Sequence, residues 1–169
     1  MIKLFQPRLF LASIFDLDLQ RLHARGVQGL IMDLDNTLVG WNRPELSHEL
    51  KVWFQSVRDT GFKMCIVSNN LTERVDQFAE KVGVMAIPRA AKPRRRSFRT
   101  AMRRMGTTNH NTAVIGDQVF TDILGGNRLR LFTILVHPID AQEYWTTQLV
   151  RRVERYVVKR PHLPQGFSQ

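Results

Sequence analysis

The sequence predicts a single α/β domain, a doubly wound three-layer sandwich in which helices cover both faces of a mainly parallel sheet. Three observations lead to this prediction. Short apolar runs alternate with helical patterns along the chain, which is typical of successive βαβ units. The 169 residues suit one domain, since domains usually span roughly 100–200 residues. Polar side chains follow four successive strands, and ligands bind at that edge of such sheets.

The core of the predicted domain runs from about residue 27 to 140. Apolar runs too short for helices predict strands at 27–32, 63–67, 84–87, 112–115 and 132–136. Apolar residues spaced three and four apart predict helices at 44–60, 72–82, 97–105, 120–129 and 141–158. The last of these belongs to a basic C-terminal helical segment at about 141–160. All of 1–169 is expected to form one domain.

The N-terminal segment, residues 1–25, precedes this core. Its first half combines Lys3 and Arg8 with many apolar side chains, so it could lie as an amphipathic element on an anionic membrane. The alternative is that it packs over the edge of the sheet. We favour packing, because the apolar residues exceed what one interfacial face requires.

The composition excludes several classes of protein. An apolar fraction of 43% is too high for a disordered chain. The lone Cys65 excludes a disulfide framework and a cysteine-built zinc site, and it fits a reducing compartment. No apolar run approaches the roughly 20 residues of a membrane span. A soluble, cytoplasmic protein is therefore expected.

The positive charge is concentrated in two stretches. Lys plus Arg number 25 against 15 Asp plus Glu, a net charge of +10. Residues 86–106 contain many basic residues and no acid, and a second basic cluster follows residue 145. Such clusters attract anionic partners, namely RNA, an anionic membrane or a phosphorylated substrate. Solvated helix faces are the alternative for both clusters.

Chemically useful side chains follow the predicted strands. In chain order they are Asp33 and Asp35, then Ser68 and Asn69, then Lys92, and finally Asp117 with Asp122. Carboxylates at adjacent strand ends would repel one another unless a cation lay between them, and such an oxygen-rich cluster suits Mg²⁺. Hydroxyl, amide and ammonium groups are the donors that a phosphoryl group needs. The pattern therefore indicates Mg²⁺-dependent phosphoryl transfer, with one carboxylate as nucleophile and another as acid and base.

The same residues resemble the four motifs of the haloacid-dehalogenase-like (HAD) phosphatases, whose core is a Rossmann-like sandwich. The motifs are 33–37 (Asp-Leu-Asp-Asn-Thr), Ser68, Lys92 and 116–122. The stretches 33–44, 66–70 and 116–127 resemble more closely subclass IIIA and its YqeG-type family, which is similar to the mitochondrial phosphatidylglycerophosphate phosphatases. Many HAD proteins have Gly where this chain has Asn36, and Asn tolerates turn geometry better than most residues.

The resemblance implies roles for the two aspartates of the first motif and for the lysine. Asp33 corresponds to the nucleophile and also to a metal ligand. Asp35 corresponds to the general acid and base, and its backbone carbonyl would bind the metal. Lys92 would neutralise the charge of the nucleophile and the phosphate.

The remaining motif residues are implied to bind phosphate, bind metal or support the site. Ser68, with Asn69 beside it, would hydrogen-bond the phosphoryl group. Asp117 would be the main additional Mg²⁺ ligand, and Asp122 a more distant or water-mediated one. Thr37 would fix the turn after the nucleophile.

The segments between motifs bear on the substrate. Residues 36–67 and 69–91 have no room for a cap domain, and uncapped relatives accept large or tethered phosphates; a neighbouring subunit could still supply a lid. Trp41, Asn42 and Arg43 form either a loop over the site or a structural one. The leading hypothesis is a phosphatase acting on a phosphatidylglycerophosphate-type lipid, with peripheral contact to the membrane. The alternatives are a nucleotide, sugar phosphate or phosphoprotein substrate, or a basic nucleic-acid- or ribosome-binding module with a vestigial site.

Overall fold

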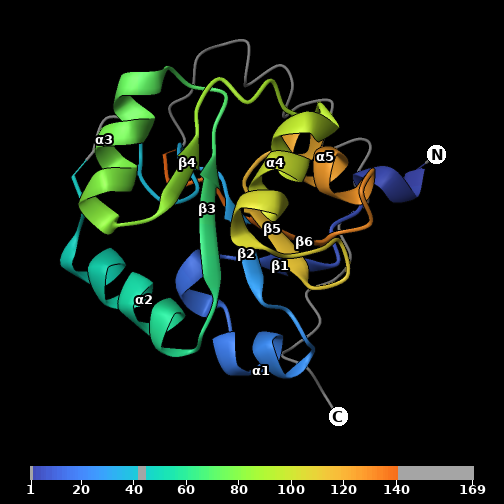
Figure 1. The fold of residues 1–169 in the computed structure, drawn as a ribbon, viewed down its shortest axis with the longest axis horizontal. Coiled ribbons are helices and arrows are strands. Elements are labelled where there is room, and N and C mark those ends of the chain that lie inside the picture. The colour runs from blue at the N-terminus through green and yellow to red at the C-terminus, as the bar shows by residue number, and fades with distance from the viewer. Residues whose placement is uncertain (1, 42–44, 141–169) are drawn as a thin grey trace.

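A computed structural model describes residues 2–41 and 45–140 (Figure 1). The predicted C-terminal helix, and Asn42 and Arg43 of the loop after the first motif, lie outside the described residues. No helix among the residues described is both long enough and apolar enough to span a bilayer.

One sheet of six parallel strands forms the centre of the fold. The strands are β1 (Leu9–Leu11), β2 (Gly29–Met32), β3 (Lys63–Val67), β4 (Met85–Ile87), β5 (Thr112–Gly116) and β6 (Phe132–Val136). Their order across the sheet is β1-β6-β5-β2-β3-β4. From β2 the chain builds outward through β3 and β4, then returns to the other side of β2 with β5. The order therefore reverses between β2 and β5, where doubly wound sheets place their ligands.

Helices cover both faces of the sheet, so the predicted three-layer sandwich is confirmed. On one side lie α1 (Leu19–Ala24), α2 (His48–Asp59) and α3 (Thr72–Val82), and on the other α4 (Arg95–Met105) and α5 (Leu124–Asn127) (Figure 1). Successive strand residues face opposite layers. Leu30 packs in the core cluster that includes Phe54 of α2, whereas Ile31 packs in the cluster that includes Phe98 of α4. In the described part of the chain, no cap domain interrupts this alternation.

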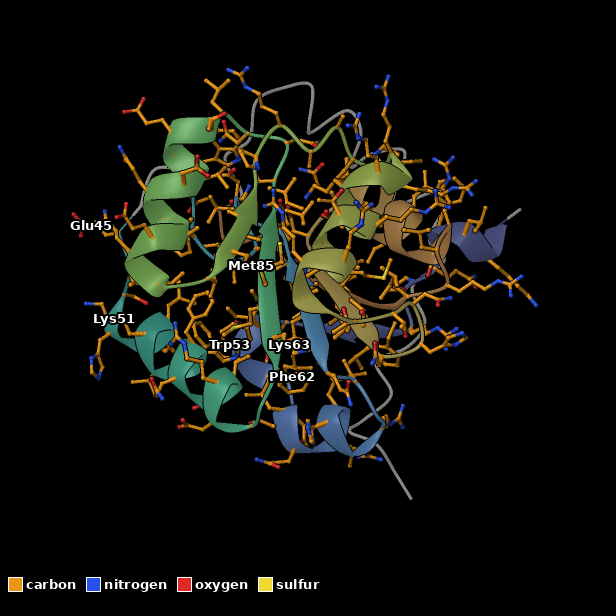
Figure 2. The ribbon with its side chains drawn as sticks, in the orientation of Figure 1. Glu45, Lys51, Trp53, Phe62, Lys63 and Met85 are labelled. Carbon is orange, nitrogen blue, oxygen red and sulfur yellow. The ribbon has the colours of Figure 1, made fainter. Side chains whose placement is uncertain are left out.

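Helix α2 shows how local sequence fixes an element. It begins at His48 rather than at the predicted residue 44, because the Ser47 hydroxyl accepts a hydrogen bond from the Leu50 backbone N–H (3.1 Å) and caps the helix. Trp53 and Phe62 point between α2 and the sheet, while Lys51 points outward (Figure 2). The apolar stripe of α2 is thus buried against β2 and β3.

The N-terminal segment packs at the edge of the sheet, as favoured, although no strand was predicted there. Residues 9–11 form the edge strand β1, and short 3₁₀ turns, η1 (Ile2–Phe5) and η2 (Ile14–Asp16), and helix α1 accompany it. The N-terminal segment therefore completes the edge of the sheet beside β6. The predicted helix 120–129 is instead a π-helical turn, η3 (Val119–Ile123), followed by the short α5. The turn forms because the backbone N–H groups of Asp122 and Ile123 both donate to the Gln118 carbonyl.

Candidate active site

The register of the sheet gathers the first, second and fourth motifs at one edge. Met32 of β2 pairs with Ile66 of β3 on one side and with Ile115 of β5 on the other. Asp33, Ser68 and Asp117 therefore leave three adjacent strands within about one residue of the same level. All three are buried. Polar side chains therefore gather at the C-terminal ends of these three strands.

Lys92 joins two of the carboxylates in this site. Its ammonium Nζ donates to Asp33 Oδ1 at 2.6 Å and to Asp122 Oδ1 at 2.7 Å. The side chain of Lys92 is only 3% exposed. Carboxylate oxygens of Asp33, Asp117 and Asp122 all lie within 4.8 Å of one another. One buried ammonium thus faces three buried carboxylates, which leaves an excess of negative charge.

Burial and the close approach of these charges shift the pKa values of Asp33 and Lys92. Burial raises the pKa of Asp33 to about 7, and the Asp122 carboxylate adds to the rise, although the Lys92 ammonium opposes it. Burial alone would lower the pKa of Lys92, but the Asp122 and Asp33 carboxylates outweigh burial and raise it. Lys92 therefore stays charged, and it does not by itself offset the carboxylates. An oxygen-only cluster with surplus negative charge fits a divalent cation.

Asp122 reaches the cluster because position 116 is glycine. A Cβ added to Gly116 would lie 2.3 Å from Asp122 Cγ, well inside van der Waals contact. The backbone N–H of Gln118 also donates to Asp122 Oδ2 at 3.2 Å. The sequence had implied a more distant position for Asp122, and the structure places its carboxylate within the cluster itself.

The Asp35 carboxylate is not among the three clustered carboxylates, and it has its own hydrogen-bond partners. Asn70 Nδ2 donates to Asp35 Oδ2 at 3.0 Å, and the Arg74 guanidinium bonds Asp35 Oδ1 through Nε (3.0 Å) and Nη2 (2.9 Å). Neither Asn70 nor Arg74 was predicted as a site residue from the sequence. Asn70 ends the Ser68-Asn69-Asn70 run, which was a usable signal. Arg74 looks like any charged residue on an amphipathic helix.

Asn69 holds the backbone of Lys92. Its Oδ1 accepts from the Lys92 backbone N–H at 2.7 Å, and its Nδ2 donates to the Lys92 carbonyl at 3.3 Å. Ala91, next to Lys92, has a φ of 53°, and Arg89 has a φ of 48°. Both are in the left-handed region, where non-glycine residues are strained. The hydrogen bonds of Asn69 thus help to fix a strained loop that aims Lys92 at Asp33.

The turn after Asp33 connects the first motif to the fourth. Asn36 adopts a left-handed conformation with φ of 61°, which asparagine tolerates better than most residues. Its backbone N–H donates to the Val39 carbonyl at 2.7 Å and closes the turn. Thr37 Oγ1 donates to Asp117 Oδ1 at 3.3 Å. Thr37 therefore ties this turn to a carboxylate of the cluster.

Comparisons with known proteins agree with this geometry. A family profile described as HAD-hydrolase-like matches residues 89–139. The chain is 42% identical over 156 residues to "Probable phosphatase YqeG" of Bacillus subtilis, covering 92% of this chain and 91% of that protein. It is 25% identical over 164 residues to "Phosphatidylglycerophosphate phosphatase 1, chloroplastic/mitochondrial" of Arabidopsis thaliana, covering 91% of this chain and 47% of that one.

A solved structure has the same fold. The cobalt-bound deoxy-D-mannose-octulosonate 8-phosphate phosphatase of Haemophilus influenzae superposes with a TM-score of 0.53, at 12% identity, over 79% of this chain and 88% of that one. That superposition shows a shared fold only. The family is shown by the identity to YqeG across nearly the whole length of both chains. This chain belongs to the YqeG family of haloacid-dehalogenase-like phosphatases.

Proposed function

We propose that this protein hydrolyses phosphate monoesters with Mg²⁺ through an aspartyl-phosphate at Asp33. The observation that most supports the proposal is the Lys92 ammonium, 2.6 Å from Asp33 and 2.7 Å from Asp122 within the carboxylate cluster. Carboxylates of Asp33, Asp117 and Asp122, with the Asp35 carbonyl, would hold the metal. The bound cation would offset charge on the phosphate oxygens.

The proposed reaction has two steps, transfer of the phosphoryl group to Asp33 and hydrolysis of the aspartyl-phosphate. A carboxylate oxygen of Asp33 attacks phosphorus and the bond to the leaving oxygen breaks, while Asp35 gives that oxygen a proton. Asp35 then takes a proton from water, which attacks the phosphoryl group and releases inorganic phosphate from Asp33. Lys92 offsets the charge of Asp33 and the phosphate, and the Ser68 hydroxyl donates to a phosphate oxygen.

Phosphate release from an aryl phosphate tests this proposal. With Mg²⁺ we expect turnover by the wild type, which EDTA abolishes and Asp33→Asn reduces by about three orders of magnitude or more, the scale of losing a nucleophile. Asp76→Asn is the matched control, because Asp76 is exposed on α3, and its activity should equal that of the wild type. Equal turnover by Asp33→Asn would contradict the proposal.

For the substrate, we propose a lipid phosphate of the phosphatidylglycerophosphate type, met at the surface of an anionic membrane. The name of the Arabidopsis relative supports the class. The exposed apolar side chains Trp41, Leu71 and Ile139, together with the exposed arginines 94–96, follow strands and so border the edge where the site opens. Apolar side chains beside cations favour an anionic lipid surface.

Turnover of phosphatidylglycerophosphate in anionic vesicles tests the substrate class. We expect it to exceed turnover of a nucleotide, a sugar phosphate and a phosphopeptide. Cleavage of soluble esters but not of vesicle lipid would exclude the lipid. RNA binding that weakens steeply with salt, combined with no Mg²⁺-dependent turnover of any ester, would instead support the nucleic-acid-binding alternative.

A further inference from the structure

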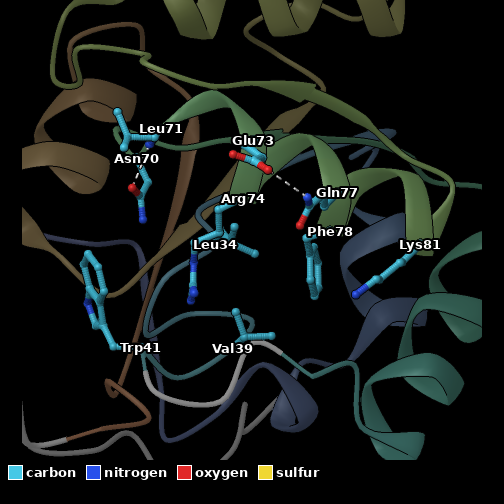
Figure 3. A pocket seen from close by; sticks show the side chains of 10 residues that line it. All are labelled: Leu34, Val39, Trp41, Asn70, Leu71, Glu73, Arg74, Gln77, Phe78 and Lys81. Carbon is cyan, nitrogen blue, oxygen red and sulfur yellow. Dashed lines mark hydrogen bonds between the residues drawn. The ribbon is translucent and has the colours of Figure 1, made fainter.

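A groove with a volume of about 460 Å³ lies along α3 (Figure 3). Two of its lining residues, Asn70 and Arg74, bond Asp35. Its lining begins with Trp41, Asn70 and Arg74 and extends along the helix to Lys81. From Arg74 to Lys81 the helix axis rises by about 10 Å. The groove therefore starts next to Asp35, the proposed general acid and base. It is long enough to hold an extended chain of several covalent bonds.

The groove combines an apolar floor with charged ends. Leu34, Val39 and Phe78 are buried and form the floor. Trp41 and Leu71 are 40% and 64% exposed, so they present apolar surface to whatever enters. Among the other lining residues, Lys81 is a cation at the far end, and the Glu73 carboxylate accepts a hydrogen bond from Gln77 at 3.4 Å. The surface is amphipathic along its length.

Arg74 stands where the groove meets the catalytic residues. Its Nε and Nη2 bond Asp35, and Nη2 also donates to the Gly40 carbonyl at 3.3 Å. The guanidinium carbon lies 5.8 Å from the centre of the Trp41 ring, within cation–π range. Nη1 has no hydrogen-bond partner among the residues that the structure describes. One edge of the guanidinium is therefore available to donate to an anion.

We infer that this groove binds the leaving group of the substrate and selects leaving groups that have a second anionic group next to a hydrocarbon portion. The inference rests on the proposed function, since it places the leaving oxygen at Asp35. Nη1 of Arg74 would donate to the second anion, and Val39, Leu71 and Phe78 would contact the hydrocarbon. Arg74 is then a specificity-determining residue, and Lys81 adds long-range attraction.

Two soluble lipids measured below their micelle concentrations test this inference. Dihexanoyl phosphatidylglycerophosphate has a phosphodiester in its leaving group, and dihexanoyl phosphatidic acid has the same acyl chains without it. We expect the wild type to prefer the first. Arg74→Gln should reduce the ratio of the two kcat/KM values about tenfold or more, the scale of a charge-assisted hydrogen bond. Arg74→Lys should restore part of the ratio.

Control variants separate this effect from a general loss of activity. Arg99→Gln changes an exposed arginine of α4 outside the groove and should leave the ratio unchanged. Leu71→Asp should lower kcat/KM for both lipids relative to kcat/KM for an aryl phosphate. The change places a carboxylate where the hydrocarbon and the anion would bind. An unchanged ratio in Arg74→Gln, with activity retained, would overturn the inference.

A binding measurement covers the case in which Arg74→Gln is inactive on every ester. Dihexanoyl phosphatidylglycerol has the phosphodiester and the chains but no phosphate monoester, so calorimetry reports its binding without turnover. Its Kd should rise about tenfold in Arg74→Gln and in Leu71→Asp, but not in Arg99→Gln. Equal Kd values in all four proteins would overturn the inference. A wild type that binds this lipid in the groove but cleaves no ester would contradict the proposed function alone.

Discussion

The ammonium of Lys92 is a buried charge that two carboxylates of the site share. It is nearly fully buried and bonds both Asp33 and Asp122. Breaking a buried ion pair by removing one partner leaves an uncompensated charge, which is far more costly than removing both partners. Lys92 is therefore expected to support stability in addition to its proposed role in the reaction.

Lys92→Met should lower the free energy of unfolding in EDTA by about 3–5 kcal/mol, because Asp33 and Asp122 lose their only ammonium among the described residues. Urea unfolding measures the change. The double variant Lys92→Met/Asp122→Asn should recover part of the loss. Lys63→Met, at an exposed lysine on β3, should stay within about 0.5 kcal/mol of the wild type. A Lys92→Met protein as stable as the wild type would show that the pair contributes nothing.

Cys65 is expected to be chemically silent in the folded protein. Burial raises the pKa of its thiol to about 12, although Arg104 acts in the opposite direction. The thiol of an unfolded cysteine has a pKa of about 8.5. The stabilising contribution of the protonated thiol is thus complete below that pH and is lost as the pH rises toward 12. At pH 8, a thiol reagent should label Cys65 only after guanidinium unfolding. Rapid labelling of the native protein would contradict its buried position.

At the scale of elements, the site depends on how closely η3 approaches the end of β5. That approach requires glycine at position 116, since Asp122 occupies the space of a Cβ there. The strand and the turn are each short, and their junction sets the position of a cluster carboxylate.

Gly116→Ala should reduce Mg²⁺-dependent phosphate release at least about tenfold, because the new Cβ displaces Asp122 from the cluster. The Kd for Mg²⁺ should rise in parallel. Ser47→Ala is a control for stability alone: it removes the cap of α2 and should cost about 1 kcal/mol without changing kcat/KM. If Gly116→Ala matched the kinetics of Ser47→Ala, the close approach would have no catalytic role.

Buried strands were predictable from the sequence, but the edge strand β1 was not. All four residues of β2 are buried, so an apolar run marks the strand and an acidic pair marks its end. β1 has three residues on the sheet edge with a mixed burial pattern, which gives no comparable signal. The helix predicted at 120–129 followed an apolar spacing that ignored Asp122, whose side chain turns inward. The Asp35–Arg74 pair joins residues far apart in the sequence, and no local pattern announces it.

For the whole molecule, a metal should act as a structural ligand. A cation that binds only the folded cluster stabilises the fold, by about 2.7 kcal/mol at a hundredfold excess over its Kd. In a chain of this size that corresponds to roughly 5–10 °C in Tm. We expect Mg²⁺ to raise the Tm relative to NaCl of equal ionic strength, and Asp117→Asn to abolish most of the rise. If Mg²⁺ raised the Tm of Asp117→Asn as much as that of the wild type, the metal would bind away from Asp117.

The fold brings together residues from four strand ends, and the central proposal is that Asp33 among them accepts a phosphoryl group. The most direct measurement is therefore acid quenching of Asp35→Asn after brief reaction with an aryl phosphate and Mg²⁺, followed by peptide mass spectrometry. Because Asp35 is the proposed base for hydrolysis, its loss should let the covalent intermediate accumulate. We predict one phosphoryl group on the peptide that contains Asp33, and none in Asp33→Asn/Asp35→Asn. Turnover with no phosphoryl group on that peptide, or with the group on another residue, would contradict a nucleophilic role for Asp33.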